Sequence, residues 1–423
     1  MVPSASTSTP AGLRAVLAPA VIVAALGYFV DIYDLILFNI VRVPSLHALG
    51  LVGDAVVNEG LSIVNWQMTG MLLGGILFGV VGDKIGRLQI LFGSITLYSL
   101  ATISNGFVGL QDLLPPLVEY KVLRFVAGIG LAGELGAGVT LVAEILPAHL
   151  RGYGTMLVAS IGVSGAVAAN GVAKLLDWRW AYWVGGALGL VLLVLRIRVR
   201  ESAMFERVKL AVGVVRGDFL ALFRSGDRLR RYAASILIAM PIWFSNQILV
   251  ALSPEFARAL GVTGPIGAGD AVAAFYGGLV LGDLSSGLLS QALRSRRRVI
   301  VLFISLLAAA NVTYFLAGRG ASPALFLGLC ALLGYAGGYW AVFITVAAEQ
   351  FGTNIRATVA TTVPNFVRGL VVAVNLMFVW ARPSLGLFGA AAAVGVFWFA
   401  LALLSAASLR ETFGVDLDYA EPE

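Results

Sequence analysis

Long apolar runs recur along the whole chain, and each is about 20 residues long, the length needed to cross the hydrocarbon core of a bilayer. Residues of the AVILMFWYC set make up 59% of the 423 residues, and charged residues only 12%, against about 25% in an ordinary soluble domain. A membrane β-barrel would show alternating segments of about ten residues instead. The chain is therefore predicted to be an all-α membrane protein, which excludes a soluble α/β enzyme and a disordered chain.

The hydropathy pattern predicts twelve transmembrane helices. The first run carries Asp31 and Asp34 and lacks an A-x-A cleavage site, so we interpret it as a retained helix rather than a signal peptide. The predicted helices cover residues 14–42, 62–82, 88–109, 117–146, 152–174, 179–199, 231–252, 268–292, 298–318, 324–349, 357–381 and 384–408.

The longest polar connection divides the chain into two halves of six helices. The predicted domains are an N-terminal bundle over 1–199, a cytoplasmic central loop over 200–230 and a C-terminal bundle over 231–423. Charged pairs recur with the same spacing in both halves, which predicts two pseudo-symmetric bundles around a central path. These pairs are Glu144 with Arg151 and Glu349 with Arg356.

Most of the 29 Lys and Arg residues flank the predicted helices on the side of the central loop. Cytoplasmic loops carry such an excess of Lys and Arg, so the loop and both termini are predicted to be cytoplasmic in a cell membrane. The net charge of +6 thus reflects orientation and does not indicate nucleic-acid binding.

The sequence lacks the residues that several kinds of catalytic, metal-binding or nucleotide-binding site require. One Cys and two His predict neither a disulfide framework nor a metal site. The sequence contains no G-x-x-x-x-G-K-[ST] phosphate loop and no nucleophile–His–acid set. We therefore expect no enzyme activity and no cofactor, and a monomer whose partners are a small-molecule substrate, protons and the lipid bilayer.

A motif between the second and third predicted helices resembles the signature of the major facilitator superfamily, G-x-x-x-D-[RK]-x-G-[RK]. It runs Gly79-Val-Val-Gly-Asp83-Lys84-Ile-Gly86-Arg87. In that superfamily, charges at the cytoplasmic helix ends form a network that closes this side. The resemblance thus implies a cytoplasmic gate, with positive-inside orientation alone as the other interpretation. Its residues would be Asp83, Lys84, Arg87, Glu144 and Arg151.

Within that superfamily the chain is similar to the metabolite:proton and phosphate:proton symporters. Gly27-Tyr-Phe-Val-Asp31-Ile-Tyr33-Asp34-Leu35 resembles their first helix, and Arg124-x3-Gly128-x4-Gly133-Glu134 resembles their fourth. The resemblance implies secondary transport, with an acid near Glu134 handling the proton or the substrate.

Three acids inside predicted helices are candidates for proton coupling: Asp31, Asp34 and Glu134. Ionisable groups are costly in a membrane and mark function by default. Asp31 and Asp34 share a helix face at i, i+3, and two close carboxylates tend to hold a proton between them. One of them could instead be an ion-pair partner with only the other titrating.

Arg368 is predicted near the middle of the eleventh helix, where its planar guanidinium would bind an anion. The alternative is permanent pairing with Asp34 or Asp283. Asn365, one turn before Arg368, could add a hydrogen bond. The further candidates for the substrate site are Asp283, Tyr33, Asn246 and Gln247.

These residues predict a secondary transporter that works by alternating access, co-transporting a small anion such as an organic acid or phosphate with protons. Arg368 would bind the anion, and Asp34 with Asp31 or Glu134 would carry the proton. Uptake of a neutral sugar, polyol or zwitterion, export by antiport, and a solute sensor remain alternatives.

Overall fold

The computed structural model is helical, and no β-strand occurs among the residues it describes. Eight of its helices are long and apolar enough to cross a membrane. The prediction of an all-α membrane protein is thereby confirmed. The structure describes residues 18–85, 87–110, 114–133, 151–200, 219–414 and 421.

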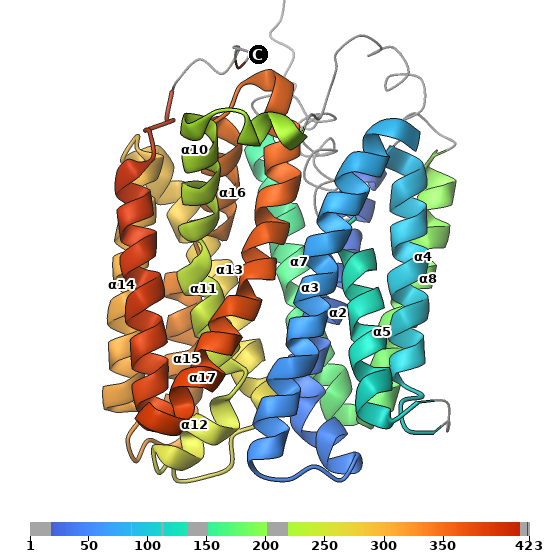
Figure 1. Ribbon diagram of the computed structural model, residues 1–423, viewed down its shortest axis with the longest axis vertical. Helices are drawn as coiled ribbons and strands as arrows, with labels where there is room; N and C mark the ends of the chain where they lie inside the picture. The colour runs from blue at the N-terminus through green and yellow to red at the C-terminus, as the bar shows by residue number, and fades with distance from the viewer. Residues whose placement is uncertain are drawn as a thin grey trace, which may run out of the picture.

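The first half of the chain forms one bundle of helices that run nearly parallel to the long axis of the molecule (Figure 1). Its most extensive contacts join α2 to α7 and α3 to α5. The helices are α2 (Pro19–Ala48), α3 (Asp54–Ile85), α4 (Arg87–Asn105), α5 (Pro116–Leu131), α7 (Arg151–Leu175) and α8 (Trp178–Arg200).

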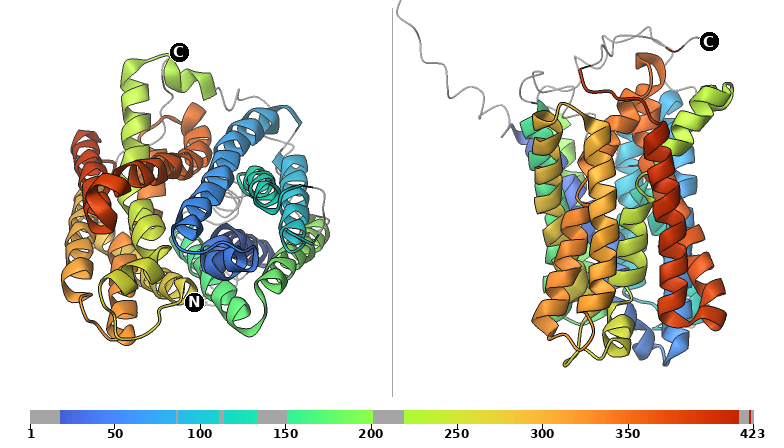
Figure 2. Two further views of the ribbon diagram at one scale, coloured as in Figure 1. Left: turned by 60° about the horizontal axis from the view of Figure 1, so that its bottom comes forward. Right: turned by 90° about the vertical axis from the view of Figure 1, so that its left-hand side faces the viewer.

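The second half forms a similar bundle beside the first, and the two are seen from one end in the left view of Figure 2. Its helices are more often interrupted. They are η1 (Phe219–Phe223), α10 (Gly226–Leu237), α11 (Met240–Phe244), η2 (Ser245–Val250), α12 (Ser253–Ala259), α13 (Ala268–Ala292), α14 (Arg296–Ala317), α15 (Pro323–Gly337), α16 (Trp340–Glu349) and α17 (Thr353–Ser408).

The predicted helix limits hold best where the apolar run is uninterrupted, as in α13, which spans the predicted 268–292. The seventh predicted helix is instead divided into α10, α11 and the π-helix η2, and the tenth into α15 and α16. The eleventh and twelfth form the single element α17, bent at Gly386, whose φ of 68° lies in the left-handed region that favours glycine.

The first helix continues six residues past its predicted end at residue 42 and stops at Ala48. The reason is that Arg42, which ends the apolar run, is buried and ion-paired rather than exposed at a helix end. A helix of this bundle therefore extends beyond its apolar sequence where a partner neutralises its charge.

Small residues bring α3 and α5 into backbone contact. A Cβ added to Gly70 would lie 2.2 Å from the carbonyl oxygen of Phe125, and one added to Gly128 would lie 2.1 Å from that of Gln67. Such close crossings are how membrane helices gain packing energy without a hydrophobic driving force. This crossing holds Arg124 of α5 against α2 and α3.

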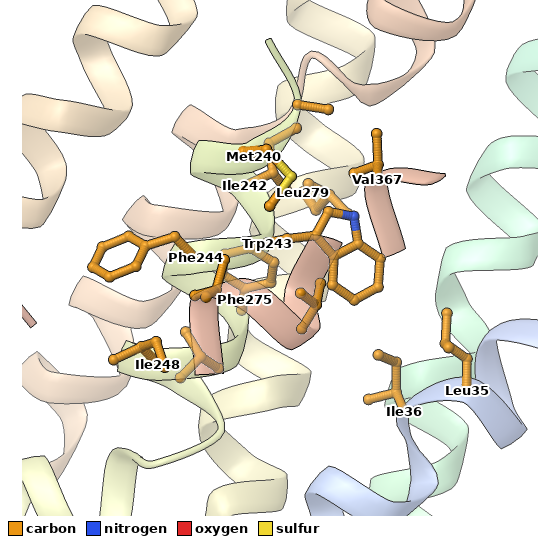
Figure 3. Close-up of a cluster of buried hydrophobic side chains, with 14 of the residues drawn as sticks. Leu35, Ile36, Met240, Ile242, Trp243, Phe244, Ile248, Phe275, Leu279 and Val367 are labelled. Carbon is orange, nitrogen blue, oxygen red and sulfur yellow. The ribbon is translucent and has the colours of Figure 1, made fainter. Parts of the chain in front are cut away.

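The hydrophobic core is continuous from one bundle to the other. Trp243 of α11 points its indole toward Leu35 and Ile36 of α2, while Phe275 and Leu279 of α13 lie behind it (Figure 3). The interface between the bundles is therefore a packed surface at this level, and the site described below lies within it.

Glu411, just beyond α17, fixes the start of α14. Its carboxylate accepts hydrogen bonds from the Ser295 hydroxyl, the backbone N–H groups of Arg296 and Arg297 at 3.0 and 3.3 Å, and that of Phe413 at 3.0 Å. Partial burial alone raises the pKa of Glu411, but these hydrogen bonds outweigh it and hold the pKa below its usual value.

Replacing Glu411→Gln is expected to lower the stability of the protein by about 0.5–1 kcal/mol at neutral pH, the usual worth of a charged group at a helix N-terminus. Because the folded pKa is lowered, this stabilisation is present above the unfolded pKa and is lost as the pH falls through the folded pKa. Thermal unfolding in detergent should show a difference between wild type and variant at neutral pH that vanishes in acid. A difference that persists in acid would contradict this assignment.

Candidate functional site

A small cavity lies between the two bundles, near the middle of the helices. Its volume is about 30 Å³, enough for one or two water molecules and well below the roughly 300–1,000 Å³ of a ligand pocket. Its walls come from α2 and α7 of the first bundle and from α11, η2, α13, α16 and α17 of the second. The polar and aromatic residues that line it are Tyr28, Trp243, Asn246, Phe275, Tyr276, Trp340 and Arg368.

Arg368 of α17 is the charged residue in this lining. Its side chain is 2% exposed, and its guanidinium carbon lies 6.0 Å from the centre of the Trp243 ring. Among the described residues, Nε has no hydrogen-bond partner and no carboxylate forms an ion pair with this guanidinium. A buried charge without a directly bonded counter-ion is costly, so this arrangement favours an anionic ligand.

Two further polar atoms in the cavity wall also lack partners among the described residues. They are Oδ1 of Asn246 and Nε1 of Trp243. Asn246 is brought here by η2, whose π-helical turn is a distortion frequently found at functional sites. The residues that line this aromatic cavity thus carry one acceptor, one neutral donor and one cation, a chemistry suited to a small polar ligand with a planar ring.

Asp31 lies close to this cavity. It is 4% exposed, and its charge acts on the Arg368 guanidinium. The Tyr28 hydroxyl is within range of three charges, those of Asp31, Asp283 and Arg368. Tyr28 therefore lies among two carboxylates and one guanidinium. The structure thus places one of the predicted coupling acids beside the predicted anion ligand.

Asp34 is directed elsewhere. Its Oδ1 accepts a hydrogen bond of 3.1 Å from Arg124, which also donates to the Asp34 carbonyl at 3.0 Å and to Oε1 of Gln67 at 3.3 Å. Arg124 is 0% exposed. The interpretation that Asp34 pairs with Arg368 is therefore wrong, because the α3–α5 crossing brings another arginine closer. A role of Asp34 in proton coupling stays a prediction.

Of the predicted substrate residues, the structure places Arg368 and Asn246 in the cavity lining and the others outside it. The Tyr33 hydroxyl donates to the Ala181 carbonyl at 2.9 Å inside the first bundle, and Gln247 accepts from Asn39 at 3.2 Å across the interface. The Asn365 amide donates to the Ala132 carbonyl at 3.2 Å.

Asp283 does not line the cavity either; its Oδ1 accepts from the backbone N–H of Ala341 at 3.1 Å. The contacts of these candidates are thus hydrogen bonds within the protein, and their role in transport stays a prediction.

Several predicted residues lie outside the described part of the structure. These are Glu134 and Glu144, together with the side chains of Asp83, Lys84, Arg87 and Arg151. Their assignment to proton coupling and to the cytoplasmic gate stays a prediction.

The sequence does not predict that Tyr276 lines the cavity or that η2 is a π-helical turn. Tyr276 lies in an apolar stretch of α13, and only its spacing of seven residues from Asp283, two helical turns on one face, could have suggested it. The π-helical turn has no signal in the sequence beyond Pro241, which interrupts the backbone bonding before it.

A set of ion pairs joins the two bundles at the end of the molecule opposite the C-terminus, the lower end in Figure 1. We call these pairs the interbundle seal. Arg42 of α2 pairs with Glu255 of α12 at 2.8 Å, Lys174 of α7 with Asp270 of α13 at 2.5 Å, and Arg382 of α17 with Asp54 of α3. In this structure the seal separates the cavity from that end.

The three pairs of the seal contribute unequally. Asp54 and Lys174 are 78% and 59% exposed, and exposed pairs contribute about 0–1 kcal/mol. Arg42 is 1% exposed and also donates to the Ala251 carbonyl at 3.1 Å. Because an unpaired charge there would be buried, the Arg42–Glu255 pair dominates the seal.

The sequence profile of the Major Facilitator Superfamily matches residues 15–375 of this chain. The chain belongs to the Major Facilitator Superfamily. It is therefore a multi-pass membrane transporter of a small-molecule substrate and not an enzyme, as the motif after the second helix had indicated.

Relatives of this transporter differ in the substrates that their names give. A putative metabolite transport protein of Haemophilus influenzae is 31% identical over 53% of each chain, so this chain spans about half the length of that relative. The niacin transporter NiaP of Acinetobacter baylyi is 27% identical over 70% of this chain and 72% of its own. A probable 4-methylmuconolactone transporter of Cupriavidus pinatubonensis is 26% identical over 93% and 90%.

Solved structures support the fold. The proton:xylose symporter XylE bound to 6-bromo-6-deoxy-D-glucose matches 96% of this chain and 98% of its own with a TM-score of 0.69 at 17% identity. The architecture of two six-helix bundles is thereby confirmed.

Replacing Asp34→Ala is expected to destabilise this transporter by about 3–5 kcal/mol, because it leaves the Arg124 guanidinium buried without its carboxylate. Thermal unfolding without ligand should show a large decrease in the midpoint. The double variant Asp34→Asn with Arg124→Gln should recover part of it, since it removes both charges. Equal midpoints for Asp34→Ala and wild type would show that the pair is not structural.

Replacing Glu255→Gln is expected to shift the bundles toward opening at the seal by about 1–3 kcal/mol, roughly 5- to 150-fold in the population ratio. Spin labels at Val52 and Thr263, both exposed on that end, would report the change as a longer component in the distance distribution. The native Cys330 is buried and should stay unlabelled.

The control for this experiment is Asp54→Asn, which removes an exposed pair of the same seal and should change the distribution little. An unchanged distribution in Glu255→Gln would contradict the dominance of the Arg42–Glu255 pair.

Proposed function

We propose that this transporter carries small aromatic or planar carboxylates together with protons into the cell. The observation that carries the proposal is the buried Arg368 guanidinium, which forms no ion pair among the described residues and lies over Trp243 in an aromatic cavity. A guanidinium offers a planar fork that matches a carboxylate. A ring attached to that carboxylate would lie between Trp243 and Trp340, whose ring centres are 6.3 Å apart.

The small cavity volume bears on how such a ligand enters. The two tryptophan rings are in direct edge contact, at 70° to one another, so a substrate ring must separate them. We therefore interpret the structure as a contracted conformation. The substrate-bound state would be reached by movement of the bundles or of the cavity wall, as alternating access requires.

Charge balance in the cavity gives a reason for coupling to protons. With Arg368 and Asp31 both charged, the site is neutral overall. Adding a carboxylate alone would leave one net negative charge in a region of low dielectric, which is costly. Protonation of Asp31 removes that charge, so the anion and the proton are expected to load together. One anion with one proton is an electroneutral cargo.

Names of relatives favour an organic acid over phosphate or a sugar. They include transporters of niacin, of 4-methylmuconolactone and of 3-(3-hydroxy-phenyl)propionate, the last from Escherichia coli at 28% identity over 68% of this chain. Proline/betaine transporters are among the relatives as well. The xylose symporters resemble this chain in fold at 15–17% identity, which carries no argument about substrate.

Orientation and residue roles are part of the same proposal. The positive-inside distribution of Lys and Arg supports cytoplasmic termini, and the interbundle seal would then face outward in a cell membrane. The cavity would then connect to the cytoplasm when the other end opens. Arg368 and Asn246 would bind the substrate, Asp31 would carry the proton, and the transporter would work as a monomer.

Replacing Arg368→Gln is expected to lower the apparent affinity for nicotinate by about 10- to 100-fold, the worth of one charged hydrogen-bonding partner. Uptake of labelled nicotinate into proteoliposomes with an alkaline interior measures this. Arg368→Lys should restore little of the affinity, because an ammonium lacks the planar fork.

The matched control is Arg319→Gln, which removes an exposed arginine from the loop between α14 and α15 and should leave uptake unchanged. Undiminished uptake by Arg368→Gln would contradict the proposal. Uptake of xylose or betaine in place of any carboxylate would replace it with another substrate class.

A further inference from the structure

The cavity wall formed by Trp340 depends on a break in a helix. α15 ends at Gly337 and α16 begins at Trp340, so the indole that lines the cavity belongs to the first residue of a new helix. The side chain of the N-cap residue Tyr339 accepts no hydrogen bond from the first backbone N–H groups of α16. A helix that starts inside a membrane needs partners for those groups.

Asp283 of α13 supplies such a partner. Its Oδ1 accepts from the backbone N–H of Ala341 at 3.1 Å, and the Trp340 N–H also lies within its reach. A carboxylate at a helix N-terminus is stabilising because it meets both the free N–H groups and the positive end of the helix dipole. The first turn of α16, and with it Trp340, is therefore attached to α13 through one titratable group.

Two glycines make this attachment geometrically possible. A Cβ added to Gly338 in the break would lie 2.3 Å from the Cα of Gly282, and one added to Gly282 would lie 2.1 Å from the Tyr335 carbonyl oxygen. α13 and the break thus touch backbone to backbone next to Asp283. At this contact the Asp283 carboxylate adds a hydrogen bond to the backbone of α16, beside the apolar packing of Phe275 and Leu279 of α13 near Gly337.

The groups that face Asp283 come from several elements. From α2, the Tyr28 hydroxyl lies within range of its charge, and Asp31 and the α17 residue Arg368 act on the same hydroxyl. Tyr335 and Tyr339 flank the break. Cations on the neighbouring helices are paired with other acids. Lys174, the charged residue among the described side chains of α7, pairs with Asp270 in the seal. Arg296 of α14 pairs with Glu349 at the far end of α16. No described cation forms an ion pair with Asp283, so its charge is balanced chiefly by the start of α16.

We infer that Asp283 is a positioning residue for the substrate site. Its charged carboxylate holds the start of α16 so that Trp340 closes the cavity. Protonation of this carboxylate releases the first turn of α16 and lets Trp340 move out of the substrate's path. A protonated carboxyl keeps one weaker acceptor and loses the charge that attracts the helix terminus. The use of this movement in transport rests on the proposed function; the movement itself does not.

The movement can be measured without any substrate. The protein would be labelled uniformly with 5-fluorotryptophan, and the ¹⁹F resonance of Trp340 would be assigned from its absence in Trp340→Phe. In wild type, the Trp340 resonance is expected to shift with pH in a single step. In Asp283→Asn, which has no charge to lose, it is expected to stay at the acid-end position at every pH.

Two variants complete the experiment. Asp283→Glu should restore the step with a displaced midpoint, and Ser285→Ala should titrate as wild type, because that hydroxyl bonds only the Leu281 carbonyl of its own helix at 2.7 Å. Should Asp283→Asn fail to fold, the wild-type step and its displacement in Asp283→Glu test the same point.

The inference is overturned if the Trp340 resonance does not respond to pH, if the step persists in Asp283→Asn, or if it is abolished by Asp31→Asn while Asp283 is intact. Absence of nicotinate binding together with an intact titration would remove the proposed function and leave this inference standing. Binding of nicotinate without the titration would do the reverse.

Discussion

One buried arginine that forms no ion pair among the described residues sets the chemistry of this transporter. Three arginines of the described helices are 2% exposed or less, namely Arg42, Arg124 and Arg368. The first two each form an ion pair, Arg42 with Glu255 and Arg124 with Asp34. Arg368 has no such pair among the described residues. Direct pairing of each of the others offsets a penalty of several kcal/mol. Arg368 has only the longer-range charge of Asp31, which points to a ligand whose carboxylate pairs with the guanidinium directly.

Irregular helices in the second bundle bring the site together. The π-helical η2 turns Asn246 toward the cavity, and the break between α15 and α16 places Trp340 opposite Trp243. In the first bundle, Arg124 of α5 pairs with Asp34 of α2, whereas Arg42, Lys174 and Asp54 pair with residues of the second bundle. The helix interruptions that shape the cavity wall thus belong, among the described residues, to the second bundle.

The fold could be predicted from the sequence because a bilayer sets the length of a membrane helix and admits only helices and closed β-barrels. The same constraint made Arg368 recognisable, since a midspan arginine is rare without a function. What the sequence could not predict is which acid meets which arginine. Asp34 and Asp31 are one turn apart, yet the Gly70–Gly128 crossing brings Arg124 to Asp34, and Asp31 lies on the side of the cavity. Helix breaks escaped prediction for a related reason, because the glycines at 337 and 338 are equally compatible with close packing inside an intact membrane helix.

The central claim is that the cavity takes up an anion and a proton together. Isothermal titration calorimetry of nicotinate binding, repeated in buffers of different ionisation enthalpy, counts the protons bound with the ligand. The account predicts uptake of about one proton per nicotinate near neutral pH in wild type and in Arg319→Gln, reduced toward zero in Asp31→Asn. Binding of nicotinate without proton uptake in the wild-type protein would contradict it.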